Sequence, residues 1–527
     1  MTKGKKAMAL VLAGTMLAAV LAGCGSEEQA SEGGKITLTW WTQNYGNQYI
    51  SSFDEMEAYQ KIQEINNVDI QYIHPVVGQE KDQFNIMVAS GDYPDLIDYN
   101  WGASYTGGVQ RAIKDGVILD ISDKIESLAP NYISMLKSNP DFMRTAKTVD
   151  GKLVTFNTIK NDIRVNSYYG PQLRKDWLDK LNLPVPETID QWHDTLKAFK
   201  TQDPNGNGQT DEVPFVDSSS MNLYSFSSAW GVIKGEFHTK QDGTFVYGSI
   251  EPEFKEYLKT MNQWYNEGLI DSEFTSIATK NRDARMTDDT GGAYIGYIGS
   301  QMEKYLSAKA NDPKYDIVAA PWPVGPAGKP YSAFKTLPKQ VEYGLGTAIT
   351  PQNKHVEESI KLLDFNYTEE GIVLHNWGIE GKSYVKDGDG YKFTDEILNN
   401  PEGKSVNETI YHYNLAMNGG SGKVMDGDAY VALTQPRQQE KDAAQIWASG
   451  DNSLLMPSFG FTEEEATTVS KVMADVKTYE DEMLTKMLIG LEPIDKFDEY
   501  VATVKNMGID KVIQIYKNAY ERYKTQA

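Results

Sequence analysis

Hydrophobic and polar residues follow one another in a regular order over the first hundred residues of the chain. Residues 36–46 form a short apolar run that stops at polar and glycine residues, which predicts a buried β-strand followed by a loop. Residues 51–66 predict a helix, residues 68–76 a second strand and residues 81–90 a second helix that ends at glycine. A third strand is expected from Leu96. This order predicts a mainly parallel sheet with helices on both faces, an α/β fold.

The remainder of the chain continues the α/β pattern. Residues 173–181 predict a short amphipathic helix, and Thr188 is placed to cap the next one. Residues 257–267 carry a helical apolar stripe, and residues 291–300 predict a glycine-flanked strand. From Thr462 onward the pattern is helical. Because single cores stop growing near roughly 250–300 residues, a chain of 527 residues is expected to form two domains.

The first 24 residues have the pattern of a secretory signal. Lysines precede an apolar run over residues 7–22, which is short for a membrane span. The segment ends in Leu-Ala-Gly-Cys, and Cys24 is the one cysteine in the chain. This ending resembles the lipobox of bacterial lipoproteins, which implies removal of residues 1–23 and a lipid anchor on Cys24. An ordinary signal peptide with a chance cysteine is the alternative. Residues 24–34 are polar and are expected to form a flexible tether.

Charge and motif content narrow the function classes. The formal net charge is −23, and such an acidic surface repels nucleic acid and anionic lipid. With one cysteine, disulfides within the chain are excluded, so stability must come from buried apolar surface and a metal. The sequence contains neither HExxH nor GxSxG, and its six histidines lack metal-ligand spacing. These features favour a binding protein over an enzyme and exclude a nucleic-acid partner.

Several stretches spread along the chain resemble one family. They are residues 90–97, 168–192, 257–274 and 377–384. Together with the lipobox, they are similar to the extracellular solute-binding lipoproteins of carbohydrate ABC transporters, in particular the LplA-like group of Gram-positive bacteria. The resemblance implies a two-lobed periplasmic-binding-protein-like fold, in which each lobe is a mainly parallel sheet flanked by helices. It also implies that the lobes close on an oligosaccharide and present it to a membrane permease.

A two-lobed fold requires the chain to cross a hinge more than once. The crossings are expected near residues 155–165, 335–350 and 400–415. The predicted N-terminal lobe comprises residues 35–160 and 345–410, and the predicted C-terminal lobe comprises residues 161–344 and 411–527.

Aromatic and polar residues in loops are the candidate ligand contacts. In open α/β sheets, ligands bind outside the carboxyl ends of the strands, which points to the loops after the first and third strands. Tryptophan offers an apolar face to the C–H face of a sugar, and polar side chains bond its hydroxyl groups. Packing in a core is the alternative for each tryptophan, and an ion pair is the alternative for the arginine. The predicted contacts are Trp41, Asn44, Trp101, Arg174, Trp230, Trp377 and Glu380.

Residues 201–214, TQDPNGNGQTDEVP, carry the most specific chemical motif. Oxygen-bearing side chains at alternate positions, followed by Gly208, match the first positions of an EF-hand calcium loop. Pro214 stands where an EF-hand carries its bidentate glutamate, so acids inside the loop must supply the carboxylates. A similar loop binds structural calcium in the alginate-binding members of the family, and the resemblance implies the same here. A polar turn without metal is the alternative. The predicted ligands are Asp203, Asn205, Asn207, Gln209, Asp211 and Glu212.

The sequence therefore predicts a monomeric binding lipoprotein with structural Ca²⁺, anchored on the extracellular face of the cytoplasmic membrane. Its expected partners are an oligosaccharide and the permease subunits of an ABC importer. Two alternatives stay open. A glycosidase needs only two suitably spaced carboxylates, so a lipid-anchored enzyme that degrades polysaccharide is one. A surface sugar sensor that partners a membrane kinase is the other.

Overall fold

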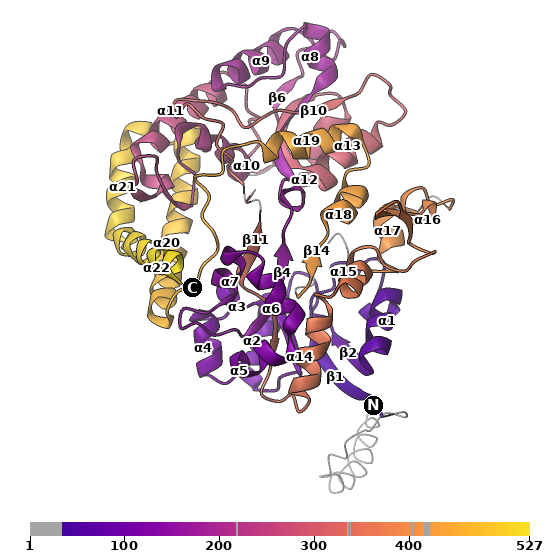
Figure 1. Ribbon diagram of the computed structural model, residues 1–527. Coiled ribbons are helices and arrows are strands. Elements are labelled where there is room, and N and C mark those ends of the chain that lie inside the picture. Colours follow the sequence, from indigo (N-terminus) through magenta and orange to yellow (C-terminus); the bar gives the residue numbers. More distant parts are fainter. Residues whose placement is uncertain are drawn as a thin grey trace, which may run out of the picture.

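The computed structural model describes residues 34–526, apart from 218–219, 335–336, 338, 403 and 416–421. The predicted signal segment and Cys24 lie outside the described residues. Two β-sheets, each flanked by helices, build two lobes that stand one above the other in Figure 1. We call the lobe around the six-stranded sheet the first lobe and that around the four-stranded sheet the second. Across the described stretches, no helix combines the length and apolar character needed to cross a bilayer.

The first lobe contains a mixed six-stranded sheet. Its first three strands in the chain are parallel, with β1 between β2 and β3, while β11 runs antiparallel to both β3 and β4. The short strand β14 pairs in parallel with β4 at the edge. In spatial order the strands are β14 (Val424–Met425), β4 (Thr155–Lys160), β11 (Gln340–Ile349), β3 (Leu96–Asn100), β1 (Ile36–Trp41) and β2 (Val68–Ile73).

Alternation along the strands of this sheet fills a core on each face. Leu38 and Trp40 of β1 belong to one buried cluster, whereas Trp41 belongs to another together with Phe84. Helices cover both faces because their apolar stripes need burial against the sheet. The helices of the first lobe are α1 (Glu57–Asn66), α2 (Glu80–Ser90), α3 (Trp101–Ser104), α4 (Gly108–Lys114), α5 (Ser122–Leu128), α6 (Pro130–Lys137), α7 (Pro140–Ala146), α14 (Val356–Phe365), α15 (Glu369–Asn376), α16 (Asp395–Leu398) and α17 (Val406–Ile410).

The second lobe is built on a smaller mixed sheet. The central strands β5 and β9 are antiparallel, β10 runs antiparallel to β5, and β6 runs parallel to β9. In order these strands are β10 (Ile317–Ala319), β5 (Tyr169–Arg174), β9 (Gly291–Tyr297) and β6 (Val213–Phe215). Its helices are α8 (Lys175–Leu181), α9 (Ile189–Thr201), α10 (Ser220–Tyr224), α11 (Pro252–Asn266), α12 (Thr279–Thr287), α13 (Glu303–Ala308), α18 (Gly427–Thr434) and α19 (Gln438–Ala448). Two hairpins complete the strands, β7 (Phe237–Thr239) with β8 (Phe245–Tyr247) and β12 (Tyr384–Asp387) with β13 (Gly390–Phe393).

The chain ends in three helices that lie along one side of the molecule, drawn in yellow in Figure 1: α20 (Glu463–Leu488), α21 (Phe497–Asn506) and α22 (Ile509–Thr525). Their apolar side chains, such as Val476 and Leu484, belong to the core of the second lobe. The start of α20 also reaches the first lobe, where the Glu463 carboxylate lies 2.8 Å from the Arg111 guanidinium and 2.9 Å from the Lys114 ammonium.

The two-lobed α/β fold predicted from the sequence is confirmed, but the sheets are mixed, not mainly parallel. The antiparallel pairs arise at β5 and β11, the strands that follow the first two passages of the chain between the sheets. The chain leaves the first sheet after β4, returns at β11 and leaves again after β14. Strand β14 lies beyond the stretch 400–415 where the third crossing was expected, because it pairs with β4 first. The residue boundaries of the lobes stay a prediction.

Candidate functional site

A cavity of about 700 Å³ lies between the two sheets, and both lobes line it. We call it the interlobe cavity. The first lobe contributes residues that follow β1 and lie at the carboxyl end of β3, which is where ligands bind in open α/β sheets. The second lobe contributes Tyr297 at the carboxyl end of β9 and the turn that follows it. The first-lobe side includes Gln43, Tyr45, Asp98, Tyr99, Asn100, Lys160, Gln340, Glu342 and Asn407, and the second-lobe side includes Tyr168, Tyr297, Ser300 and Tyr430.

Two exposed aromatic rings face this cavity from different lobes. Tyr45 is 47% exposed and Tyr297 is 39% exposed, although most large apolar side chains of the described chain are buried. Tyr297 does not stand alone, because its ring stacks on that of Tyr168. Exposed aromatic faces on both walls can hold a flat, partly apolar ligand between them.

The first-lobe wall carries charged groups. Asp98 is 8% exposed, and its carboxylate accepts a hydrogen bond of 3.1 Å from the Thr42 hydroxyl. The Lys160 ammonium lies 3.6 Å from the Glu342 carboxylate, so these two charges offset each other. Carboxylates and amides at such a wall accept and donate hydrogen bonds to hydroxyl groups.

Tyrosine hydroxyls in the cavity stay protonated at neutral pH. Burial raises the pKa of Tyr45 to about 12, and the neighbouring carboxylates of Asp98 and Glu342 add to the shift. Burial also raises the pKa of Tyr168 to about 12, again with a contribution from Glu342. Both phenols can therefore act as hydrogen-bond donors and acceptors toward a ligand.

A buried lysine lies beneath the cavity. Lys423 is 2% exposed, and its ammonium donates a 2.7 Å hydrogen bond to the backbone carbonyl of Leu415. Burial lowers the pKa of Lys423 to about 8, while the Asp98 carboxylate acts in the opposite direction. Asp98 and Lys423 share a small pocket under the cavity floor, so the charge of Asp98 is balanced from behind.

None of the seven predicted ligand contacts is among the described residues that line the interlobe cavity. Trp41 is buried and packs edge-on against Tyr99 at 5.2 Å, and Trp101 is fully buried against Phe84. Asn44 closes its own turn, where its side chain accepts from the Gly46 N–H and donates to the Ile50 carbonyl. The predicted loops were therefore the right ones, but neighbouring residues in them face the cavity.

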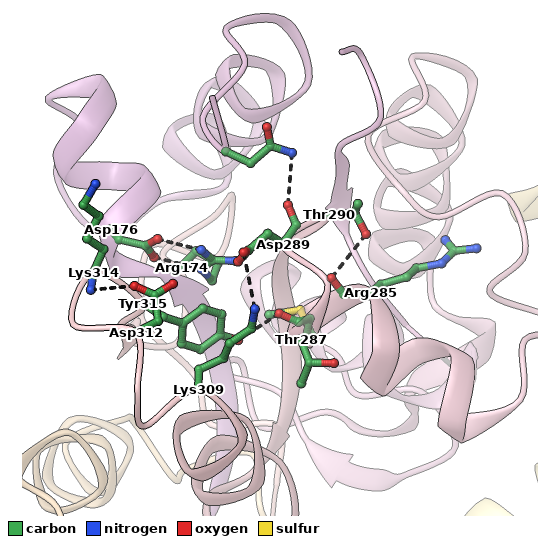
Figure 2. Close-up of polar contacts among 12 residues, drawn as sticks. Arg174, Asp176, Arg285, Thr287, Asp289, Thr290, Lys309, Asp312, Lys314 and Tyr315 are labelled. Carbon is green, nitrogen blue, oxygen red and sulfur yellow. Dashed lines mark hydrogen bonds and ion pairs between the residues drawn. The ribbon is translucent and has the colours of Figure 1, made fainter. Parts of the chain in front are cut away.

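Arg174 lies in a buried ion-pair cluster at the end of β5 (Figure 2). Its guanidinium bonds the Asp176 carboxylate at 2.6 and 2.8 Å and lies 2.9 Å from Asp289. It also stacks over the Tyr315 ring at 4.1 Å from the centroid. With a 3% exposed side chain, Arg174 has its charge matched inside the second lobe, as the ion-pair alternative predicted.

The other three predicted contacts are dispersed. Trp230 is 7% exposed and lines a separate cavity of about 1320 Å³ whose wall belongs to the second lobe. Trp377 is buried and stacks on Phe393 at 4.6 Å. Glu380 is exposed, with its carboxylate 4.0 Å from the Lys386 ammonium. The ligand role of all seven residues stays a prediction.

The predicted calcium loop folds as a tight turn around Asp203. The Asp203 carboxylate accepts hydrogen bonds of 2.9, 3.1 and 3.1 Å from the backbone N–H groups of Gly206, Asn207 and Gly208. The side-chain amides of Asn205 and Asn207 both reach the Asp211 carboxylate, each with a contact of 3.1 Å. These bonds draw the oxygen-bearing side chains of the loop together.

Glu212 supplies the observation that points to a cation. Both of its carboxylate oxygens are buried and have no hydrogen-bond partner among the described residues. Burial raises the pKa of Glu212, and the nearby carboxylates of Asp211 and Asp203 raise it further. Across the described chain, no three His, Cys, Asp or Glu side chains converge as a metal centre, so amide and backbone oxygens would have to complete a ligand set here.

Comparison with known proteins relates the whole chain to one group. The family model described as bacterial extracellular solute-binding protein matches residues 39–372. The fructooligosaccharide ABC transporter substrate-binding protein FusA of Streptococcus pneumoniae is 26% identical, over 96% of each chain. Lipoprotein LipO of Bacillus subtilis is 26% identical over 99% of each chain.

Solved structures share the fold. The alginate-binding protein AlgQ2, crystallised without calcium ion, is 25% identical over 94% of this chain and 100% of its own, with a TM-score of 0.72. FusA in complex with kestose is 23% identical over 93% of this chain and 100% of its own, with a TM-score of 0.75. An EF-hand mutant of FusA in complex with fructo-nystose has a TM-score of 0.72, at 22% identity over 93% of this chain and 100% of its own.

Proposed function

The chain belongs to the bacterial extracellular solute-binding proteins, and from this membership we propose that it captures an oligosaccharide in the interlobe cavity and delivers it to the permease of an ABC importer. Members of this family bind solutes and do not transform them. The proposal names the ligand class, the cavity that holds it and the machine that receives it.

The observation that carries the proposal is the pair of exposed tyrosines in the interlobe cavity. Tyr45 and Tyr297 come from different lobes and face the same space. A sugar ring has apolar C–H faces that stack on aromatic rings and hydroxyl groups around its edge that bond polar side chains. Asp98, Asn100 and Gln340 offer such polar groups on the same wall. Closure of the lobes would bury the sugar between the two rings.

The relatives support a saccharide ligand. FusA, which matches nearly the full length of this chain, has been crystallised with kestose, a trisaccharide. AlgQ2 is an alginate-binding protein. A cavity of about 700 Å³ is large enough for a ligand of a few sugar rings, since ligand pockets typically measure about 300–1,000 Å³.

We further propose that the loop from Asp203 to Glu212 holds a structural calcium ion. The fit rests on Glu212, whose buried carboxylate has no partner in the described chain, and on the amide and carboxylate oxygens gathered around it. A hard cation with oxygen ligands would neutralise the three carboxylates and pin the loop to the second lobe. The ligands would be Asp203, Asn205, Asn207, Gln209, Asp211 and Glu212.

Location and partners complete the proposal. We place the protein on the extracellular face of the cytoplasmic membrane, tethered through a lipid on Cys24, and we expect it to act as a monomer. Support comes from the Leu-Ala-Gly-Cys ending of the signal segment and from the likeness to Lipoprotein LipO. Radiolabelled palmitate should enter the expressed chain and should not enter a Cys24→Ala variant.

Isothermal titration tests the proposed function. The chain from Gly25 onward, which keeps every described residue, is titrated with kestose, maltotetraose, β-1,4-mannotetraose and β-1,4-cellotetraose, and with uronic acid oligomers. We expect saturable 1:1 binding of at least one saccharide, together with a smaller radius of gyration in solution scattering. Absence of binding across the panel, or steady release of reducing ends, would refute the proposal.

A further inference from the structure

We propose that the interlobe cavity accepts uncharged oligosaccharides and rejects those built from uronic acids. The inference rests on the proposed function and narrows its substrate class. It concerns a choice that the relatives leave open, because FusA is a fructooligosaccharide-binding protein and AlgQ2 an alginate-binding protein, so neutral and anionic saccharides are both represented among similar folds.

The charges on the cavity wall carry the argument. Asp98, Glu342 and Lys160 are the charged side chains among the described residues that line the cavity. The Lys160 ammonium lies 3.6 Å from the Glu342 carboxylate, and both side chains are mostly buried, with exposures of 22% and 28%. A ligand carboxylate would therefore meet one cation that already has an anionic partner.

The second nearby cation is shielded from the ligand. Lys423 is 2% exposed, and it lies under the cavity floor, where its ammonium donates to the Leu415 carbonyl. Asp98 lines both the cavity and the small pocket that contains Lys423. The group that a ligand meets at this point is the carboxylate of Asp98, and the balancing ammonium stays behind it.

The arginines closest to this region in the chain are also committed. Arg164, one residue before the cavity-lining Val165, bonds the Asp162 carboxylate and lies 2.8 Å from that of Asp428. Arg174, which could have received a ligand carboxylate, forms its ion pairs with Asp176 and Asp289 inside the second lobe. No arginine is found among the cavity-lining residues that the structure describes.

Desolvation then decides between the two ligand classes. A uronate carboxylate loses its hydration when the lobes close and needs a cation or several donors in return. This cavity would place it near Asp98 or Glu342, which repel it. A hydroxymethyl group carries no charge and can donate to these same carboxylates. The high pKa values of Tyr45 and Tyr168 have the same origin in part, since both phenols lie near carboxylates that disfavour a second negative charge.

Matched ligands test the inference. β-1,4-Mannotetraose and β-1,4-tetramannuronate differ only in the hydroxymethyl or carboxylate group on each ring, and tetragalacturonate is added as a second uronate. We expect a neutral member of the titration panel to bind, and both uronates to bind at least 100-fold more weakly than it does. A uronate that binds as tightly as the best neutral sugar overturns this inference and leaves the proposed function intact. No binding by any saccharide refutes the proposed function, and the inference with it.

A variant tests the physical cause. Glu342→Gln keeps the shape of the side chain and releases the Lys160 ammonium, so affinity for tetramannuronate should rise at least tenfold. Glu357→Gln is the control, because Glu357 pairs with Lys124 at 2.8 Å in the first lobe and does not line the cavity. An equal change in both variants, or none in Glu342→Gln, would overturn the assignment of selectivity to this pair. The melting temperature of each variant confirms that it is folded.

Discussion

The phenol ring of Tyr168 stacks on that of Tyr297, with 5.9 Å between the ring centroids and 16° between the planes. Tyr168 directly precedes β5, and Tyr297 ends the neighbouring antiparallel strand β9. Phe334 meets Tyr168 edge-on at 5.5 Å. The exposed face of Tyr297 is thus held in place by two further rings, which makes it a rigid surface on which a sugar can stack without first losing side-chain freedom.

Replacement of Tyr297 by alanine should lower the affinity for the oligosaccharide about 30-fold. Loss of an aromatic stacking face with its buried area removes roughly 2 kcal/mol of binding free energy, and about 1.4 kcal/mol corresponds to tenfold. The dissociation constant measured by isothermal titration checks the prediction. Tyr45→Ala should act in the same direction from the other lobe.

Tyr49→Ala is the matched control for these two variants. Tyr49 belongs to the same loop as Tyr45 and stacks on Tyr411 at 5.7 Å, yet it does not line the interlobe cavity. Its replacement should leave the dissociation constant within about twofold of the unmodified chain. A loss of affinity in Tyr49→Ala equal to that in Tyr297→Ala would show that stacking in this cavity is not the cause.

Arg174→Ala should destabilise the protein and leave ligand affinity unchanged. Removal of one partner from a buried ion pair typically costs about 3–5 kcal/mol because the remaining carboxylates, here Asp176 and Asp289, keep their desolvation penalty. Urea unfolding gives the change in free energy, and titration of the folded protein gives the affinity.

An exposed arginine provides the comparison. Arg111 has a side chain that is 43% exposed and pairs with Asp115 and Glu463, so Arg111→Ala should cost no more than about 1 kcal/mol. If Arg174→Ala instead weakened ligand binding at unchanged stability, Arg174 would have to contact the ligand after all.

Local signals in the sequence predicted many elements well. Thr188 and Thr462 were expected to cap helices, and each forms a capping box with Gln191 or Glu465 at the start of α9 or α20. The glycine after residues 81–90 ends α2, where Gly91 adopts a left-handed conformation. These features depend on residues three or four apart, so a sequence displays them directly.

The candidate site was predicted less well because it depends on which way a residue faces. The loops after β1 and β3 do line the cavity, but through Tyr45 and Asn100, while Trp41 and Trp101 turn into the core. Successive strand residues point to opposite faces, and the sequence alone does not say which face is the ligand side. The Asp98–Lys423 neighbourhood also joins residues more than three hundred positions apart, a pairing set by sheet order.

Calcium should raise the melting temperature of the protein over that measured in EGTA. At a concentration 100-fold above its dissociation constant, a ligand of the folded state adds about 2.7 kcal/mol of stability, which corresponds to a shift of a few degrees in a chain of this size. Differential scanning calorimetry with 1 mM CaCl₂ or EGTA measures the shift.

Two variants connect the calcium effect to the loop. Glu212→Gln should abolish the shift, and in EGTA it should raise the melting temperature, because it removes a buried carboxylate without a partner in the described chain. Asp242→Asn is the control, since Asp242 caps a separate turn by accepting from the Thr244 N–H at 2.9 Å. A melting temperature that does not respond to calcium in the unmodified chain would contradict the proposed site.

Lys423 should make stability rise with pH at alkaline values. Its pKa is about 8 in the folded protein because burial disfavours the charged ammonium, whereas an unfolded lysine titrates near 10.4. Below pH 8 both states hold the proton, and the full penalty of burying the charge is present. Between about pH 8 and 10.4 the unfolded chain binds more protons than the folded one, so the free energy of unfolding increases with pH, by about 3 kcal/mol in total.

The contribution of Lys423 is isolated by comparing the unmodified chain with Lys423→Met. Urea unfolding at intervals from pH 7 to 10.5 gives the difference in the free energy of unfolding between the two proteins. That difference should shift by about 3 kcal/mol in favour of the unmodified chain as the pH rises, while the unpaired charge of Asp98 in the variant contributes equally at every pH in this range. Lys124→Met, which removes an exposed lysine from its pair with Glu357, corrects for the general effect of losing a lysine. A difference that stays constant from pH 7 to 10.5 after this correction would mean that the ammonium of Lys423 is not desolvated in the folded protein, and the balance of charge behind Asp98 would have to be reassigned.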